Sequence, residues 1–301
     1  MNHLPSLFIV GSLKAGTTAL ATYLSKNPQF YFPPGTFQQW GKMEPNYFAS
    51  INPCISKEDY LQYFSGMRAD QIGVDSSPWY LFFAEKSSWE IREFNPSAKI
   101  IIMLRRPIEV IKSLYAELSF HGMDTNRSFD EALAYGIHNG AASRRHNGPI
   151  LYQDIVNWAP QVNHYMNQFS EDHLKIILFD DFAVTTENVF EDTLRFAGAE
   201  SYDVCNFNAI NTRKYVLFPS VNRILRNPPT FIKRLARVTK AKPVCEAFRQ
   251  RIICLITSTK KRPDRTVISE NNMRRLKEII YKQNKDLEVV LKRPLPARWY
   301  D

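Results

Sequence analysis

A loop bounded by two glycines carries the side chains best suited to chemistry. Residues 8–25 read FIVGSLKAGTTALATYLS, in which an apolar run predicts a short buried strand at 8–10 and the segment opened by Thr17 predicts a helix. A strand, a glycine loop and a helix N-terminus together bind phosphate well, because unpaired backbone N–H groups and the helix dipole favour an anion. Lys14 would add a positive charge beside that anion, and the hydroxyl groups of Thr17 and Thr18 would add hydrogen bonds.

The position of the lysine separates this loop from the nucleoside-triphosphate loop, which reads G-x-x-x-x-G-K-[ST]. Gly11 and Gly16 keep the glycine spacing, but Thr17 stands where that lysine belongs and the lysine lies inside the loop. The pattern G-x-x-K-x-G-T-T resembles the 5′-phosphosulfate loop of sulfotransferases that use 3′-phosphoadenosine 5′-phosphosulfate (PAPS). The resemblance implies that the 5′ end of this nucleotide is bound by Lys14, Ala15, Gly16, Thr17 and Thr18, with Lys14 also taking part in catalysis.

A second cationic motif follows a longer apolar run. Residues 99–104, KIIIML, predict a central parallel strand, and Arg105 comes directly after it. Because ligands gather at the C-terminal ends of the strands in an open α/β sheet, we expect Arg105 beside the first loop. Its guanidinium could grip a second phosphate through two hydrogen bonds. Arg105, Pro107 and Ser113 match the sulfotransferase pattern R-x-P-x-x-x-x-x-S, which implies that Arg105 and Ser113 hold the 3′-phosphate of PAPS.

Two further segments resemble the acceptor side of such enzymes. Residues 44–48, EPNYF, resemble the K-E-P-H-F-F element of bacterial and heparan-sulfate sulfotransferases, whose glutamate deprotonates the acceptor hydroxyl. The expected general base is therefore Glu44, a role typically worth about 10²–10⁴-fold in rate. Asp75 and the run SSPWYL that follows it resemble G-E-x-[ST]-P-x-Y-L, although serine stands where the heparan group has lysine. Asp75 and His121 are alternative bases, and the expected acceptor contacts are Asp75, Ser77 and His121.

A fainter likeness extends the expected nucleotide site. Residues 211–215, NTRKY, resemble a late cofactor loop of the same family, which adds Arg213 and Lys214 to the expected nucleotide contacts. The resemblance covers about residues 5–215 and returns weakly at 264–299. It implies transfer of the sulfuryl group of PAPS to an acceptor hydroxyl, with a saccharide or glycolipid as the expected acceptor. We expect no metal cofactor, because sulfate carries less charge than a triphosphate and no metal-ligand spacing occurs.

The remaining patterns predict the elements that position these motifs. An apolar run also predicts a buried strand at 175–179, and we expect a short strand at 30–32 and the end of another at 73–75. Apolar periodicity predicts helices at 57–65, 108–120, 129–136, 151–168, 186–197, 221–239, 243–257 and 268–291. The alternation of strands and helices predicts an α/β fold, with a P-loop-like central parallel sheet flanked by helices and a helical C-terminal part. We expect a single domain over 1–301, with its core at about 5–215 and a basic helical extension at about 216–301.

Positive charge is concentrated in residues 223–262. This segment holds twelve lysines and arginines and one glutamate, while the whole chain of 301 residues has a net charge of +9. The simplest interpretation is two helices with a solvated basic face. The alternatives are contact with an acidic acceptor, such as an anionic polysaccharide, or with an anionic membrane surface. Nucleic acid is the least favoured partner, because no nucleic-acid-binding motif accompanies the charge.

Composition restricts the compartment and leaves two other functions open. No apolar run reaches the ~20 residues of a membrane span, the start of the chain lacks a signal-peptide pattern, and the four cysteines match no zinc spacing. We therefore expect a cytoplasmic protein, free or peripheral to a membrane. One alternative function is a P-loop-type kinase of a small metabolite, against which the missing lysine argues. The other is a non-catalytic module that binds anionic glycans or membranes through 223–262.

Overall fold

A computed structural model describes residues 4–36, 44–49, 55–121, 128–139, 152–202, 207, 215–216, 257–258 and 267–301. The basic segment 223–262 and the helices expected at 221–239 and 243–257 lie outside these ranges, apart from the backbone of residues 257–258. Arg213 and Lys214 also lie outside them.

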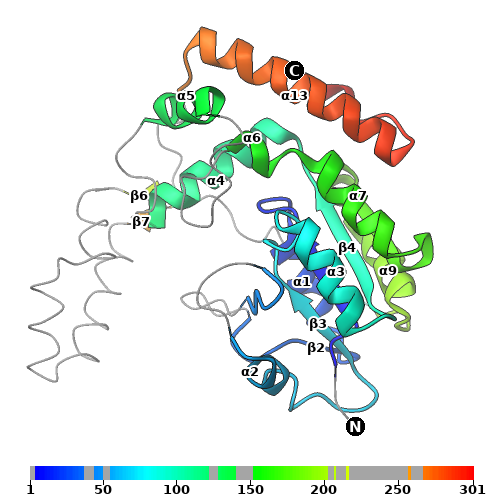
Figure 1. The fold of residues 1–301 in the computed structure, drawn as a ribbon. Coiled ribbons are helices and arrows are strands. Elements are labelled where there is room, and N and C mark those ends of the chain that lie inside the picture. The colour runs from blue at the N-terminus through cyan, green and yellow to red at the C-terminus, as the bar shows by residue number, and fades with distance from the viewer. Residues whose placement is uncertain are drawn as a thin grey trace, which may run out of the picture.

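Five parallel strands form the central sheet, which confirms the predicted architecture (Figure 1). Their order across the sheet is β2-β3-β1-β4-β5, and every neighbouring pair is parallel. Because all five run in the same direction, their C-terminal ends meet at one edge, where the predicted motifs begin. The strands are β1 (Leu7–Gly11), β2 (Phe30–Tyr31), β3 (Ile72–Ser76), β4 (Lys99–Leu104) and β5 (Leu174–Leu178).

The helices agree with the predicted ones in most places. Two helices were not expected from the sequence, α3 and α8, and the helix expected at 151–168 is divided into α6 and α7. The helices are α1 (Thr17–Leu24), α2 (Lys57–Gln62), α3 (Ala84–Phe94), α4 (Pro107–His121), α5 (Phe129–Asn139), α6 (Tyr152–Ile155), α7 (Trp158–Gln168), α8 (Phe179–Val184), α9 (Thr186–Ala197) and α13 (Glu270–Leu291). Short 3₁₀ helices occur at Glu171–His173 and Ala297–Trp299, and β6 (Tyr215–Val216) pairs with β7 (Thr257–Ser258) in a separate antiparallel sheet.

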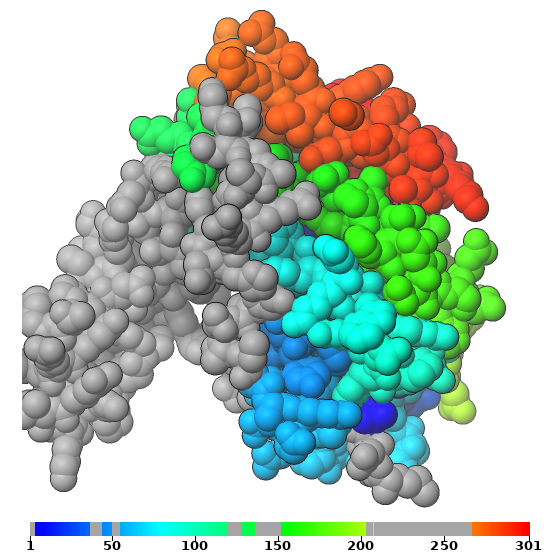
Figure 2. All heavy atoms as spheres, viewed as in Figure 1, coloured from blue at the N-terminus to red at the C-terminus, as the bar shows by residue number. Residues whose placement is uncertain are grey.

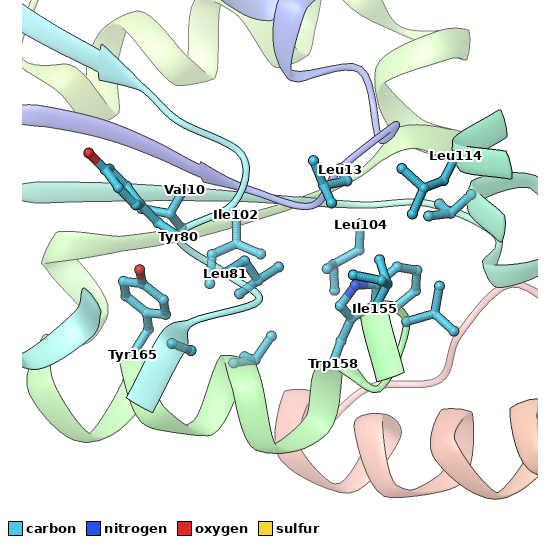
Figure 3. Packing of buried hydrophobic residues seen from close by; sticks show 14 of the residues in the cluster. Val10, Leu13, Tyr80, Leu81, Ile102, Leu104, Leu114, Ile155, Trp158 and Tyr165 are labelled. Atoms are coloured by element: carbon cyan, nitrogen blue, oxygen red, sulfur yellow. The ribbon is translucent and has the colours of Figure 1, made fainter. Parts of the chain in front are cut away.

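Apolar side chains cover both faces of the sheet. Alternate residues of a strand point to opposite faces; in β1, Phe8 and Val10 join one buried cluster, whereas Leu7 and Ile9 join the other. The first cluster includes residues of α2 to α7 and of α13, and part of it is drawn in Figure 3. The second includes residues of α1, α8 and α9. Burial on both faces explains why β1 and β4 read as continuous apolar runs.

The C-terminal helix α13 lies against α5, α6 and α7, as Figures 1 and 2 show. It buries Leu276, Ile280 and Leu287. Beyond it, Trp299 packs on Trp158 of α7, with ring centroids 5.8 Å apart, and its indole N–H donates to the carboxylate of Asp180. The end of the chain is thereby fixed to the main body. Within the described ranges, no helix combines the length and apolar character needed to cross a membrane.

Candidate active site

The loop between β1 and α1 depends on its two glycines. Gly11 has φ +144° and Gly16 has φ +95°, conformations that L residues with a side chain rarely adopt. A Cβ atom on Gly11 would lie 2.6 Å from Cβ of Leu81, and one on Gly16 would lie 2.9 Å from a ring carbon of Phe179. The glycine spacing that indicated an anion-binding loop is therefore also a steric requirement of the backbone.

Hydrogen bonds to the sheet and to α7 fix the loop in place. The N–H of Ser12 donates to the carbonyl of Met103 in β4 (2.6 Å), and the N–H of Ala15 donates to the carbonyl of Ser12 (3.2 Å). The indole Nε1 of Trp158 donates to Oγ of Ser12 (3.1 Å). Leu13 and Trp158, both labelled in Figure 3, belong to the same buried cluster. The loop backbone is thus preorganised, which reduces the cost of ordering it around a ligand.

The cation of the loop is held by a carboxylate of α4. Lys14 has φ +60°, and its Nζ lies 3.2 Å from Oε2 of Glu117. The Lys14 side chain is 26% exposed. Beyond it, Gly16 caps α1 in a left-handed conformation, and Thr17 is buried in the first turn. The first N–H groups of a helix have no acceptor within the helix, so this end of α1 suits an anion beside Lys14.

Arg105 lies next to the loop, where its position at the end of a strand predicted it. Its Nη1 donates to the carbonyl of Lys14 (3.4 Å), and its guanidinium carbon lies 4.3 Å from the ring centroid of Phe179. Two of its nitrogens also contact Oε2 of Glu109, at 2.7 and 2.9 Å. The same ring of Phe179 therefore supports both Gly16 and Arg105.

One face of α4 connects the two cations. Glu109, Ser113 and Glu117 follow one another at intervals of four residues, and residues so spaced share a face of a helix. Because Glu109 binds Arg105 and Glu117 binds Lys14, Ser113 is placed between the two cations. The structure thus brings together the predicted nucleotide residues Lys14, Arg105 and Ser113. Sequence reasoning missed the two glutamates, although their spacing was visible.

Asp75 forms a buried polar centre near the end of β3. Its carboxylate accepts hydrogen bonds from the hydroxyls of Tyr60 (2.8 Å), Tyr80 (2.8 Å) and Ser77 (2.6 Å). Asp75 and Ser77 are both 0% exposed. Burial raises the pKa of Asp75 to about 6, although the three hydrogen bonds act in the opposite direction. This burial argues against direct contact of either residue with an acceptor, and against Asp75 as the base.

The segment that carries Glu44 is attached to this centre. The N–H of Asn46 donates to Oγ of Ser77 (3.0 Å), and Nδ2 of Asn46 donates to the carbonyl of Glu44 (3.3 Å). Glu44 itself is half-buried. His121 is the last residue of α4, and its side chain lies outside the described part of the structure. Among the described residues, no three His, Cys, Asp or Glu side chains are grouped as a metal site would require.

Comparison with known proteins identifies the fold. No family model matches the chain. The chain is similar to a crystal structure of a sulfotransferase from Alicyclobacillus acidocaldarius, with 23% identity, a TM-score of 0.67 and 99% of each chain covered. A weaker likeness relates it to the mouse sulfotransferase SULT7A1 complexed with PAP, with 12% identity, a TM-score of 0.40, and 66% of this chain and 60% of that chain covered. Another relates it to retinol dehydratase in a complex with retinol and PAP, with 11% identity, a TM-score of 0.42, and 94% of this chain and 82% of that chain covered.

The first likeness establishes a shared fold, whereas the TM-scores of the other two are too low to support an inference. The protein therefore has the P-loop-like α/β fold of a known sulfotransferase. At the C-terminal edge of its sheet it carries a preorganised glycine loop flanked by two cations.

Proposed function

We propose that this protein is a sulfotransferase, which transfers the sulfuryl group of PAPS to a hydroxyl group of an acceptor. The observation that carries the proposal is the contact between Arg105 and the Lys14 carbonyl, which joins two motifs 91 residues apart at the edge of the sheet. The fold shared with the Alicyclobacillus sulfotransferase supports it.

The described cations suit the two anionic groups of the nucleotide. Lys14, the loop N–H groups and the start of α1 would hold the 5′-phosphosulfate, and Arg105 with Ser113 would hold the 3′-phosphate. By analogy with phosphoryl transfer, negative charge grows on the 5′-phosphate as the sulfuryl group leaves. Donors that are already fixed in place stabilise such charge most effectively, and the hydrogen bonds of Ser12 and Ala15 fix this loop.

In the proposed reaction Glu44 accepts the proton of the acceptor hydroxyl. The acceptor oxygen then forms a bond to sulfur while the bond between sulfur and the 5′-phosphate oxygen breaks, and 3′-phosphoadenosine 5′-phosphate (PAP) leaves. The products are the sulfated acceptor, PAP and the proton held by Glu44. A saccharide or glycolipid hydroxyl is the proposed acceptor, on the likeness of residues 44–48 to carbohydrate sulfotransferases. An acidic polysaccharide would be a fitting partner for the basic residues of 223–262.

Calorimetric titration with PAP and with adenosine 5′-phosphate, which lacks the 3′-phosphate, tests the two anion sites separately. The unmodified protein should prefer PAP, because a hydrogen-bonded charged contact is typically worth about 1.5–3 kcal/mol, or roughly ten- to a hundredfold in affinity. Arg105→Ala should remove that preference, whereas Lys14→Ala should weaken both nucleotides. No preference for PAP, or stabilisation by ATP–Mg²⁺ in its place, would favour the kinase alternative.

Glu44→Gln tests the base independently of the nucleotide site. It should abolish sulfuryl transfer and leave PAP affinity within about twofold, because no proton has to move for PAP to bind. Turnover at the unmodified rate in Glu44→Gln would assign the base to another residue.

A further inference from the structure

We propose that Asp75 and Ser77 are positioning residues, which hold the Glu44 segment at the edge of the sheet through a hydrogen-bond chain. The chain runs from the carboxylate of Asp75 to Oγ of Ser77 (2.6 Å) and on to the N–H of Asn46 (3.0 Å). The inference rests on the proposed function, in which Glu44 is the base. It gives a role to a fully buried carboxylate that the proposed reaction does not otherwise use.

The charge of Asp75 fixes the direction of this chain. The hydroxyls of Tyr60 and Tyr80 both lie 2.8 Å from Oδ2, which leaves Oδ1 to Ser77. A serine hydroxyl has one proton, and an ionised carboxylate can only accept it. The lone pairs of Ser77 Oγ therefore face the N–H of Asn46, as the observed contact requires. A neutral partner at position 75 would hold the hydroxyl proton less firmly and weaken the alignment of Oγ with that N–H.

The backbone at Asn46 needs such a contact. Asn46 has φ +48°, in the left-handed region that residues with a side chain rarely adopt. Its side chain also donates to the carbonyl of Glu44 (3.3 Å), so the segment folds back on itself at this residue. A strained conformation persists only where its surroundings hold it. The bond to Ser77 is therefore well placed to fix the path of the chain two residues from Glu44.

Aromatic packing holds the next two residues from the same side. The rings of Tyr47 and Tyr60 are stacked, with centroids 4.5 Å apart and planes at 11°. Phe48 packs edge-on against Tyr60 and Tyr80, with centroids 5.4 and 5.6 Å apart. The two tyrosines that donate to Asp75 thus also pack against this segment, together with Phe8 and Phe94. A backbone hydrogen bond between Phe48 and the Tyr80 hydroxyl also joins the segment to this centre, and the hydrogen bond at Asn46 adds a directional contact nearer to Glu44.

Ser77→Ala and Tyr60→Phe form a matched pair of variants for kinetic measurement. Each removes one hydroxyl donor from the Asp75 carboxylate, and both should reduce stability, but only Ser77→Ala removes the acceptor of the Asn46 N–H. Ser77→Ala should lower kcat at least tenfold with PAP affinity unchanged, whereas Tyr60→Phe should keep kcat within about threefold. A merely structural role would lower both alike. Equal kcat values for the two variants would overturn the proposal.

Hydrogen exchange of the Asn46 amide tests the anchor without any use of activity. Exchange of a peptide spanning 44–49 should be faster in Ser77→Ala than in Tyr60→Phe by at least tenfold at Asn46. Asp75→Asn, which keeps the shape of the side chain, should also speed this exchange and serves if Ser77→Ala folds poorly. Exchange that does not respond to Ser77 or Asp75 overturns the anchor. Absence of sulfuryl transfer in the unmodified protein, with the exchange result intact, would instead remove the proposed function.

Discussion

The ion pair between Lys14 and Glu117 should oppose nucleotide binding, and Glu117→Gln measures by how much. A 5′-phosphosulfate must compete with the Glu117 carboxylate for the Lys14 ammonium, whose Nζ lies 3.2 Å from Oε2 in the structure. Glutamine keeps the length and shape of the side chain and removes its charge. We therefore expect Glu117→Gln to bind PAP more tightly than the unmodified protein.

The size of the effect follows from the separation and exposure of the pair. Two unit charges at this distance attract each other by about 1 kcal/mol in water. The Lys14 and Glu117 side chains are 26% and 40% exposed, and pairs with this degree of exposure are typically worth about 0.2–1 kcal/mol in measured cycles. Loss of the pair should therefore raise PAP affinity by about 1.4- to fivefold, and the gain should shrink at high salt.

Isothermal titration calorimetry with PAP at low and high ionic strength is the suitable assay. Asp70→Asn is the matched control: it removes one carboxylate from an ion pair with Arg68 (3.1 Å) just before the start of β3, at the opposite edge of the sheet. The control should bind PAP like the unmodified protein. Weaker binding by Glu117→Gln would show that Glu117 orients Lys14 for the ligand, and equal binding would show that the pair does not compete. Either result refutes the reasoning.

Three further predictions follow from single residues. Because burial raises the pKa of Asp75 to about 6, from a usual value of 3.8, the folded state binds more protons than the unfolded state between these values. The free energy of unfolding should therefore fall by up to about 3 kcal/mol as pH rises from 4 to above 6; urea titrations of Asp75→Asn should lack this fall. Gly16→Ala should cost more stability than Gly198→Ala and abolish PAP binding, since both glycines have positive φ but only Gly16 lies against an aromatic ring; equal losses in thermal unfolding would contradict this. Trp158→Phe should weaken PAP binding severalfold, because it removes the hydrogen bond to the loop serine; unchanged affinity in calorimetry would show that this bond does not support the loop.

Strands β1 and β4 could be predicted from sequence because each is buried on both faces and reads as an apolar run. Helix α3 could not be predicted in this way, because its buried face is polar and its exposed face carries an aromatic residue. Ser87 and Ser88 are buried, while Trp89 is 55% exposed. The expected helix at 151–168 is divided at residues 156–157, where the apolar pattern continues although the helix is interrupted. Hydrophobic periodicity reports burial well and helix boundaries poorly.

The neighbouring positions of Lys14 and Arg105 followed from topology, because the ends of adjacent parallel strands must meet. The ion-pair partners of these two cations, Glu117 and Glu109, could not be predicted from the sequence, because a glutamate on a helix surface ordinarily faces solvent. The sequence also left Glu44, Asp75 and His121 as alternative bases, and the structure describes the side chains of the first two. Only burial separates them, and burial depends on side chains from α2 and from the turn after β3 that no local pattern brings together.

The contact between Trp299 and Trp158 makes the first loop of the chain depend on its last turn. During translation, Ser12 is synthesised long before the tryptophan that completes the packing beneath it. Truncation before Trp299 would remove a fully buried side chain that packs on Trp158, so loss of a few terminal residues would act on the loop at the opposite end of the polypeptide.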